Sequence, residues 1–147
     1  MKVEWKSFVF TILQFLAMLL LFLTGLWFSY RFFLNLIMIL GLGIWVWAFS
    51  IMLRQKSYGF FPEISWKSTL VTNGPFHFVR HPIYSGMLLL GFGFVLNYFN
   101  LFRFFLFLLL LVSTILKLNL EERILEKHFK EYENYQKKTK KLIPFVY

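Results

Sequence analysis

The chain alternates between long apolar stretches and polar connections. The apolar stretches cover residues 8–28, 32–53, 83–99 and 101–118. A membrane-spanning helix needs about 20 predominantly apolar residues. The first two stretches meet this length. The last two approach it once their flanks are added, with Arg103 and Lys117 expected to snorkel toward the membrane surfaces. The pattern predicts an all-α, polytopic membrane protein with four transmembrane helices in two hairpins.

The connections between these stretches are unequal in length. Residues 29–31 and a turn around 97–100 close the two predicted hairpins. The central connection 54–82 and the tail 119–147 are longer and polar. We expect the whole chain to form one membrane domain, in which the central connection and the tail build the functional site.

The tail is predicted to be helical. No glycine or proline occurs between residues 101 and 142, so nothing in the sequence stops the fourth helix at the membrane surface. Within 121–135, apolar and aromatic side chains recur at spacings of three and four, which predicts one stripe on a helix. The stripe consists of Ile124, Leu125, His128, Phe129, Tyr132 and Tyr135. By itself it is typical of an amphipathic helix lying on lipid headgroups.

Composition agrees with a membrane environment. Hydrophobic residues make up 59% of the chain and charged residues only 16%, whereas soluble domains carry about 25% charged residues. The amino terminus, with Lys2 and Lys6 before an apolar run, resembles a signal peptide. However, the run is longer than the usual ~7–15 residues and no small-residue cleavage site follows, so we expect a retained helix.

The net charge of +9 is distributed unevenly. Basic residues gather at the amino terminus, in the central connection and in the tail: Lys2, Lys6, Arg54, Lys56, Lys67, Arg80, Arg123, Lys127, Lys130, Lys137, Lys138, Lys140 and Lys141. Only Arg31 and Arg103 lie near the two short turns. The positive-inside rule therefore predicts that both termini, the central connection and the functional site are cytoplasmic. The basic residues are expected to meet anionic lipid headgroups, and no nucleic-acid partner is expected.

One run, GPFHFVRHPIYSG at 74–86, concentrates polar and conformationally special residues. Pro75 and Pro82 disfavour the α conformation at Gly74 and His81, which we expect to be extended. Pro82 suits the first position of a helix. The run therefore predicts a turn followed by the cytoplasmic start of the third membrane helix.

Charged side chains near this helix start suggest a binding site. A helix N-terminus beside Arg80 and His81 favours an anionic group, although both residues could instead face lipid phosphates. Lys117 and Glu121 are four residues apart, so they share one helix face. With Glu122 they are either a ligand-binding group or a solvated face, and spacing alone leaves both readings open.

Five glycines lie in the second and third apolar stretches: Gly41, Gly43, Gly86, Gly91 and Gly93. Close helix packing through small residues is the favoured reading, and a flat surface for a ligand is the alternative. No metal site is predicted, because the chain has no cysteine and Pro82 makes a helix through His77 and His81 unfavourable. The absence of aspartate also excludes a Ser-His-Asp triad.

Taken together, the polar residues resemble a known family. The residues that carry the resemblance are STLVTNGPF at 68–76, VRHPIYSG at 79–86, Glu121, Glu122, Phe129, Tyr132, Tyr135 and LIP at 142–144. In this order and spacing they resemble the isoprenylcysteine carboxyl methyltransferase family of integral membrane enzymes. The resemblance covers more than half of the chain and includes neither of the first two apolar stretches.

The resemblance implies S-adenosylmethionine as the cofactor. Its implied contacts are Ser68, Thr69, Leu70, Val71, Phe76, His81, Pro82, Ile83, Tyr84, Glu121 and Glu122. Lys117 is implied to contact the substrate, at a position where the family commonly has arginine. Arg80 and Glu121 are implied to act at the catalytic centre.

The function predicted from these observations is methyl transfer to a lipid-like acceptor. The acceptor could be a prenylated thiol-acid, a phospholipid amine or another apolar molecule. One alternative is an NADPH-dependent reductase of the membrane sterol type, which shares a His-Pro-x-Tyr-x-Gly run. Another is a membrane scaffold without catalytic activity.

Overall fold

The computed structural model describes residues 5–25, 32–55, 70–144 and 146–147. The elements are α1 (Trp5–Leu23), α2 (Phe32–Arg54), the short 3-10 helix η1 (Gly74–His77), α3 (Pro82–Asn97), α4 (Leu101–His128) and α5 (Tyr132–Lys138). Within these ranges the secondary structure is helical apart from one isolated bridge between Val79 and Lys140. The predicted all-α class is confirmed.

Three helices, α1, α2 and α4, are long and apolar enough to cross a membrane. The third predicted span corresponds to α3, which is apolar but only 16 residues long and ends at Asn97. At 1.5 Å per residue, the 28 residues of α4 extend about 42 Å, well beyond a hydrocarbon core of about 30 Å. The structure is that of an integral membrane protein, and a total of four spans stays a prediction.

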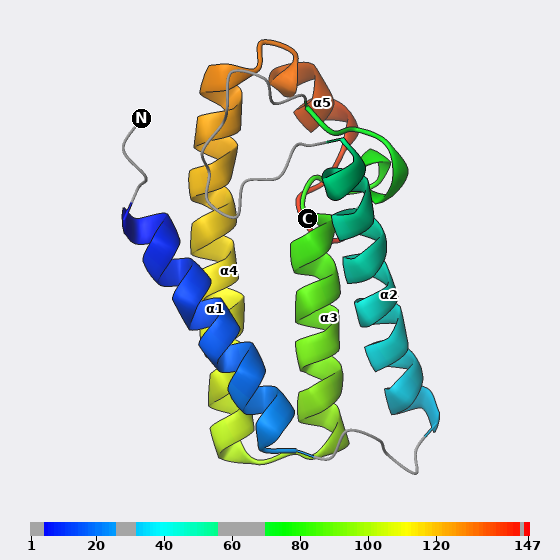
Figure 1. Ribbon diagram of the computed structural model, residues 1–147, viewed down its shortest axis with the longest axis vertical. Coiled ribbons are helices and arrows are strands. Elements are labelled where there is room, and N and C mark those ends of the chain that lie inside the picture. The colour runs from blue at the N-terminus through cyan, green and yellow to red at the C-terminus, as the bar shows by residue number, and fades with distance from the viewer. Residues whose placement is uncertain (1–4, 26–31, 56–69, 145) are drawn as a thin grey trace.

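The helices pack in a different pairing from the predicted hairpins. Figure 1 shows α1 crossing α4 and α2 lying along α3, and these two pairs make the most extensive helix contacts. The prediction that α1 and α2 form one packed hairpin is therefore wrong. The physical reason is complementarity of faces, because small residues join α2 to α3 and buried polar residues join α1 to α4.

Glycine brings the backbones of α2 and α3 close together. A Cβ atom at Gly41 would lie 2.6 Å from the backbone nitrogen of Leu90, and one at Gly86 would lie 2.6 Å from that of Trp45. Both distances are too short for any other residue without movement of the backbone. At Gly43 a Cβ would meet no atom within 4 Å. The packing interpretation is thus confirmed for Gly41 and Gly86 and does not apply to Gly43.

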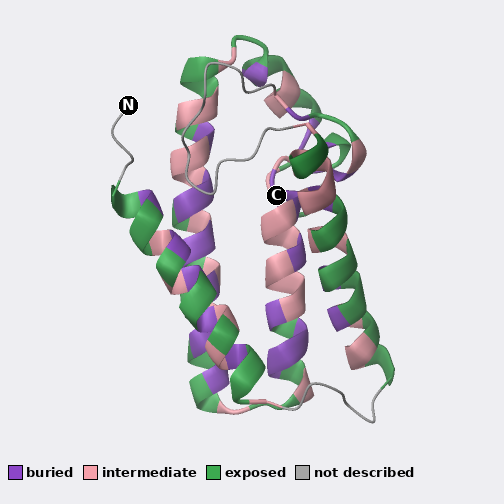
Figure 2. Cartoon of the chain, in the orientation of Figure 1, coloured by how far each residue is buried: buried purple, intermediate pink, exposed green. Residues whose placement is uncertain are grey.

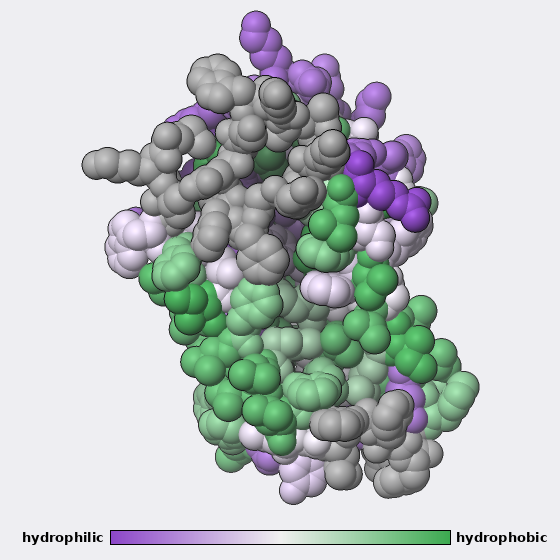
Figure 3. Space-filling view, in the orientation of Figure 1, coloured by the Kyte–Doolittle hydropathy of each residue, from purple (hydrophilic) through white to green (hydrophobic). Residues whose placement is uncertain are grey.

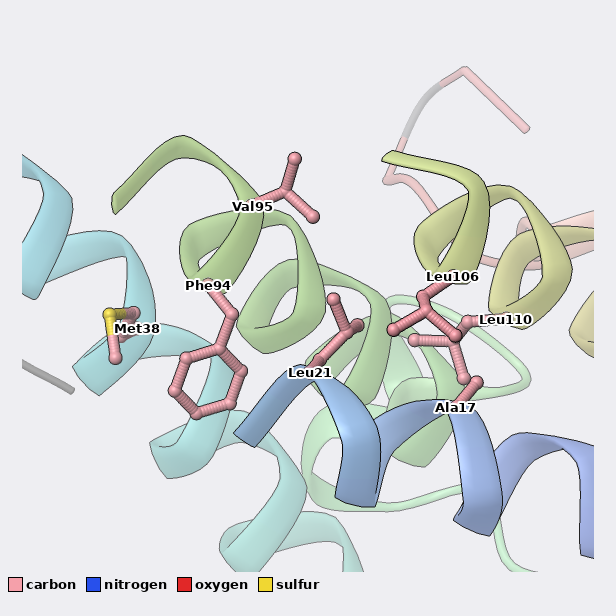
Figure 4. Packing of buried hydrophobic residues seen from close by; sticks show 7 residues of the cluster. All are labelled: Ala17, Leu21, Met38, Phe94, Val95, Leu106 and Leu110. Carbon is pink, nitrogen blue, oxygen red and sulfur yellow. The ribbon is translucent and has the colours of Figure 1, made fainter. Parts of the chain in front are cut away.

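A hydrophobic cluster joins α1, α2, α3 and α4 in the half of the bundle away from α5. It contains Ala17 and Leu21 of α1, Met38 of α2, Phe94 and Val95 of α3, and Leu106 and Leu110 of α4 (Figure 4). The outward faces of the helices are exposed (Figure 2). Apolar residues dominate this surface over the bundle, and hydrophilic residues gather at the α5 end (Figure 3). This distribution suits a bundle surrounded by lipid.

Arg103 does not snorkel to the surface as the sequence suggested, because its side chain is fully buried. Its Nη1 donates to the carbonyl of Leu21 at 2.9 Å and to Oγ1 of Thr24 at 3.0 Å. Its Nη2 donates to the carbonyl of Phe94 at 2.6 Å. Helix ends leave carbonyls unpaired, and a guanidinium with five donors can satisfy several of them.

The first helix begins and ends earlier than predicted. It was expected over 8–28, but α1 covers Trp5–Leu23 and is followed by a turn at Thr24 and Gly25. Glycine is common just after a helix end. At Gly25 it also leaves room for the guanidinium of Arg103, which a Cβ would overlap. The second predicted span, 32–53, agrees with α2 to within one residue.

The predicted single helix through the tail stripe is also wrong. The fourth helix continues to His128, as the absence of glycine and proline suggested, but Phe129 is extended and the chain turns before α5 begins at Tyr132. The break lets Tyr132 and Tyr135 face the start of α3 instead of continuing the stripe. Contacts of α5 with Phe76 and Arg80 outweigh the local preference for one continuous helix.

Candidate functional site

The tail returns to the start of α3 and pairs with it. The backbone nitrogen of Arg80 donates to the carbonyl of Lys140 at 2.7 Å, and that of His81 donates to Lys141 at 3.0 Å. Oγ of Ser85 donates to the carbonyl of Leu142 at 2.6 Å. The tail therefore closes over the same turn that the sequence singled out.

The turn itself follows the prolines only in part. Pro82 occupies the first position of α3, as predicted. Gly74 is not extended, because its φ of 61° lies in the left-handed region that glycine adopts without strain. His81 has φ −123° and ψ 57°, outside the α region but not fully extended. A following proline disfavours the α conformation of the residue before it, but it does not determine which other backbone conformation that residue adopts.

The carboxylate of Glu122 is surrounded by two cationic side chains and a histidine ring. Its Oε1 lies 2.7 Å from Nε of Arg80 and 3.3 Å from Nε2 of His81, and its Oε2 lies 3.4 Å from Nζ of Lys141. Only 7% of the Glu122 side chain is exposed. These contacts join α4, the start of α3 and the tail at one buried point.

Arg80 also binds the tail directly. Its Nη1 donates to the carbonyl of Gln136 at 3.2 Å and to that of Thr139 at 2.5 Å, at the end of α5. With Nε on Glu122, the guanidinium is engaged with protein groups on both sides. The contacts support an anchoring role for Arg80, and its participation in chemistry stays a prediction.

Glu121, the neighbouring carboxylate, faces a different environment. Its Oε1 accepts a hydrogen bond from the phenol of Tyr84 at 2.6 Å and lies 3.9 Å from Nζ of Lys117. Its Oε2 lies 3.8 Å from Nδ1 of His81, whose ring stacks on Tyr84. At 21% its side chain is more exposed than that of Glu122. Glu121 thus retains an open side on which a ligand could bind.

Lys117 does not snorkel to the surface as predicted, because its amino group bonds to a neighbouring helix; it lies deeper in the bundle, below Glu121. It is buried, its Nζ donates to Oγ1 of Thr11 in α1 at 2.7 Å, and it lies 5.6 Å from the centre of the Tyr84 ring. The predicted proximity of Lys117 and Glu121 on one helix face is confirmed. The sequence reasoning did not single out Thr11. The sequence feature that could have revealed it is the spacing of Ser7, Thr11 and Gln14, which places three polar residues on one face of a mainly apolar helix.

Several predicted cofactor contacts form an apolar wall beside this group. Phe76 and Val71 are buried against Ala48 of α2, and Ile83 packs onto them. Pro82 is fully buried and Leu70 is half-buried. The predicted contacts Ser68 and Thr69 lie outside the described residues.

Two tyrosines of α5 complete the surroundings of Arg80 and Glu122. The phenol of Tyr135 donates to the carbonyl of Phe76 at 2.5 Å. The phenol of Tyr132 is buried and has no hydrogen-bond partner among the described residues. Burial raises the pKa of both phenols, so both are neutral at physiological pH. An unpaired buried hydroxyl is uncommon in proteins and often marks a ligand or water site.

The site therefore combines a partly open carboxylate, a buried ammonium and an apolar wall at one end of a membrane bundle. The family model of phospholipid methyltransferases matches residues 30–132 of the chain. The chain belongs to this family of membrane methyltransferases. The match confirms the predicted family of membrane methyltransferases, to which the isoprenylcysteine-type enzymes are similar. No curated protein and no solved structure matches the chain significantly.

Proposed function

We propose that the protein transfers a methyl group from S-adenosylmethionine to a lipid-like acceptor at the membrane, in the manner of isoprenylcysteine carboxyl O-methyltransferases. The observation that carries the proposal is the position of Glu121. This carboxylate lies against Tyr84 and His81 on one side and Lys117 on the other, where α4 leaves the apolar bundle. The family match supports the reaction class.

The donor set fits S-adenosylmethionine. Glu121 can accept hydrogen bonds from the cofactor's ammonium group or its ribose hydroxyls. The unpaired phenol of Tyr132 is a neutral donor and acceptor next to the same cluster. The buried wall of Val71, Phe76 and Ile83 offers apolar surface for an adenine ring. We assign cofactor contacts to these residues and to the predicted set around them.

The chemistry that S-adenosylmethionine supplies when bound is an electrophilic methyl group, whose bond to sulfur breaks with the electron pair remaining on sulfur as the acceptor's lone pair forms the new bond. Lys117 would hold an anionic group of the acceptor, while Glu121 holds the cationic cofactor. A carboxylate acceptor is already ionised near neutral pH, so no residue has to remove a proton. An amine acceptor would have to release one.

Arg80 and Glu122 have a supporting role in this proposal. Their ion pair fixes the tail over the start of α3 and so holds the walls on either side of Glu121. Much of the rate would come from holding the reacting groups close together and from excluding water. A site without a strong base is sufficient for such a reaction.

We also propose that the site and both termini face the cytoplasm. The basic residues of the α5 end support this orientation through the positive-inside rule. A reporter fused after Tyr147 should be active on the cytoplasmic side of the membrane. Activity of that reporter on the opposite side would contradict the orientation.

The test of the function is equilibrium binding to the protein purified in detergent. We expect binding of S-adenosylmethionine and none of NADPH, with Glu121→Gln weakening the binding of S-adenosylmethionine at least tenfold. Glu133→Gln is the matched control, since Glu133 is exposed and pairs only with Lys137 among the described residues. Binding of NADPH alone would favour a reductase, and binding of neither would favour a scaffold.

The acceptor class is tested by transfer of a labelled methyl group. N-acetyl-S-farnesylcysteine offers a carboxylate, and phosphatidylethanolamine offers an amine near a phosphate. Label in a base-labile methyl ester is the expected result. Label on the amine instead would identify a phospholipid N-methyltransferase.

A further inference from the structure

The helix α1 carries a buried polar face that the family match does not include. Ser7, Thr11 and Gln14 are all buried, whereas the remaining buried positions of α1 are apolar. The match begins at residue 30, so α1 lies outside it. Polar side chains inside a membrane bundle are costly unless they are paired, and they frequently have a function.

Two hydrogen bonds of the same kind link this face to α4. Thr11 accepts from Nζ of Lys117 at 2.7 Å, and Thr114 accepts from Nε2 of Gln14 at 2.9 Å. Each threonine hydroxyl donates its proton to a carbonyl of its own helix, Thr11 to Ser7 at 2.8 Å and Thr114 to Leu110 at 2.7 Å. With their protons so engaged, both hydroxyls act as acceptors toward the other helix.

Only the first of these hydrogen bonds holds a charge. The ammonium group of Lys117 has three N–H donors, and its one hydrogen bond within the described part of the chain is to Thr11. Glu121 lies 3.9 Å away, which is an ion-pair distance but longer than a hydrogen bond. Donor capacity therefore remains on a buried cation next to the proposed reaction site.

We propose that Thr11 is a positioning residue that aims the ammonium of Lys117 at the anionic group of the methyl acceptor. The proposal rests on the proposed function. The Lys117 side chain is flexible, with a stem of four carbons. The hydroxyl of Thr11, held on the neighbouring helix, accepts its hydrogen bond and so restricts where the ammonium group lies. The ligand group is a carboxylate or a phosphate of a lipid-like molecule. Through Thr11, α1 takes part in substrate specificity as well as in packing.

The test measures preference for the anion. Equilibrium binding is compared between N-acetyl-S-farnesylcysteine and its carboxamide, which differ only in the charged group. A second arm compares phosphatidylethanolamine with a diacylglycerol of the same chains, which lacks the phosphate together with its ethanolamine. Because both members of a pair bind the same folded fraction, the ratio of their dissociation constants does not depend on how much protein folds.

We expect the wild type to bind the member that carries the carboxylate or phosphate at least tenfold more tightly in one of the pairs, and that pair identifies the source of the anionic group. Thr11→Val should bring that ratio to within about twofold of one, and Thr11→Ser should restore it. Thr114→Val removes the corresponding uncharged hydrogen bond, which Gln14 donates, and should leave the ratio unchanged. In turnover, Thr11→Val should raise KM more than it lowers kcat.

Three outcomes would overturn the proposal: no preference in the wild type for either pair, a preserved preference in Thr11→Val, or an equal loss in Thr114→Val. Should Thr11→Val yield no folded protein, the comparison of Thr11→Ala with Thr11→Ser decides by the same ratio. If only the role of Thr11 is wrong, the wild type still binds S-adenosylmethionine. If the proposed function is wrong, the wild type does not bind it. The two failures are therefore distinguishable.

Discussion

Arg80 and Glu122, 42 positions apart in the sequence, form a buried ion pair with 2.7 Å between Nε and Oε1. The same guanidinium binds the carbonyls of Gln136 and Thr139. One side chain thus ties the start of α3 to α4 and to the tail. Removing Arg80 would take away the shortest contact of the buried Glu122 carboxylate, and losing one member of a buried pair costs more than the pair itself contributes.

We therefore predict that Arg80→Met lowers the free energy of unfolding by about 3–5 kcal/mol. It should also release the tail, so that limited proteolysis cuts near residues 136–142. Thermal unfolding in detergent and mass spectrometry of the fragments measure the two effects. Lys137→Met is the control, since Lys137 and Glu133 form an exposed ion pair, which contributes little to stability. Equal effects of the two substitutions would refute the anchoring role.

The tyrosines of α5 allow a second prediction. Tyr132→Phe removes a buried hydroxyl that has no partner in the described structure, so it should raise the stability of the ligand-free protein by about 1 kcal/mol. Tyr135→Phe removes a hydroxyl that binds the carbonyl of Phe76 and should lower stability by about 1 kcal/mol. Melting temperatures compare the two variants.

If Tyr132 contacts the cofactor, the same substitution should weaken binding of S-adenosylmethionine severalfold while it stabilises the ligand-free form. Isothermal titration of the variant measures this affinity. Unchanged affinity together with higher stability would remove Tyr132 from the site. The phenol would then be a packing residue only.

Gly41 and Gly43 provide a third, matched comparison. Gly41→Leu places side-chain atoms where the backbone of α3 lies, so α2 and α3 should separate and folded protein should be lost. Gly43→Leu places the same side chain in open space and should be tolerated. The yield of monodisperse protein from detergent measures both. Equal yields would show that the close approach at Gly41 is not required.

The fourth prediction concerns Arg103. Arg103→Met leaves the carbonyls of Leu21 and Phe94 without this donor and should lower the free energy of unfolding by roughly 2–4 kcal/mol, as loss of hydrogen bonds from a charged group. Arg103 lies 18 residues before Glu121 on one helix, about 27 Å away. Affinity for S-adenosylmethionine in the folded fraction should therefore stay within about twofold. A large loss of affinity at unchanged stability would contradict this assignment.

Local sequence patterns predicted much of this protein because their physical causes are local. Apolar length located the long helices, and Pro82 located the start of α3, since its ring fixes φ and lacks an N–H. The spacing of Lys117 and Glu121 placed them on one face, because a helix repeats every 3.6 residues. The motif residues together identified the family. None of these inferences required knowledge of which helices touch.

Tertiary structure decided what depends on contacts between distant residues. Glu121 and Glu122 are adjacent and chemically identical, yet one pairs with Tyr84 and the other with Arg80, because successive helical residues point about 100° apart toward different neighbours. The burial of Arg103 and the contact of Thr11 with Lys117 likewise depend on which helices pair. The sequence determined the helices and the reaction class. The fold decided which charges are buried as anchors and which stay partly exposed, because burial and pairing follow from packing across the whole bundle.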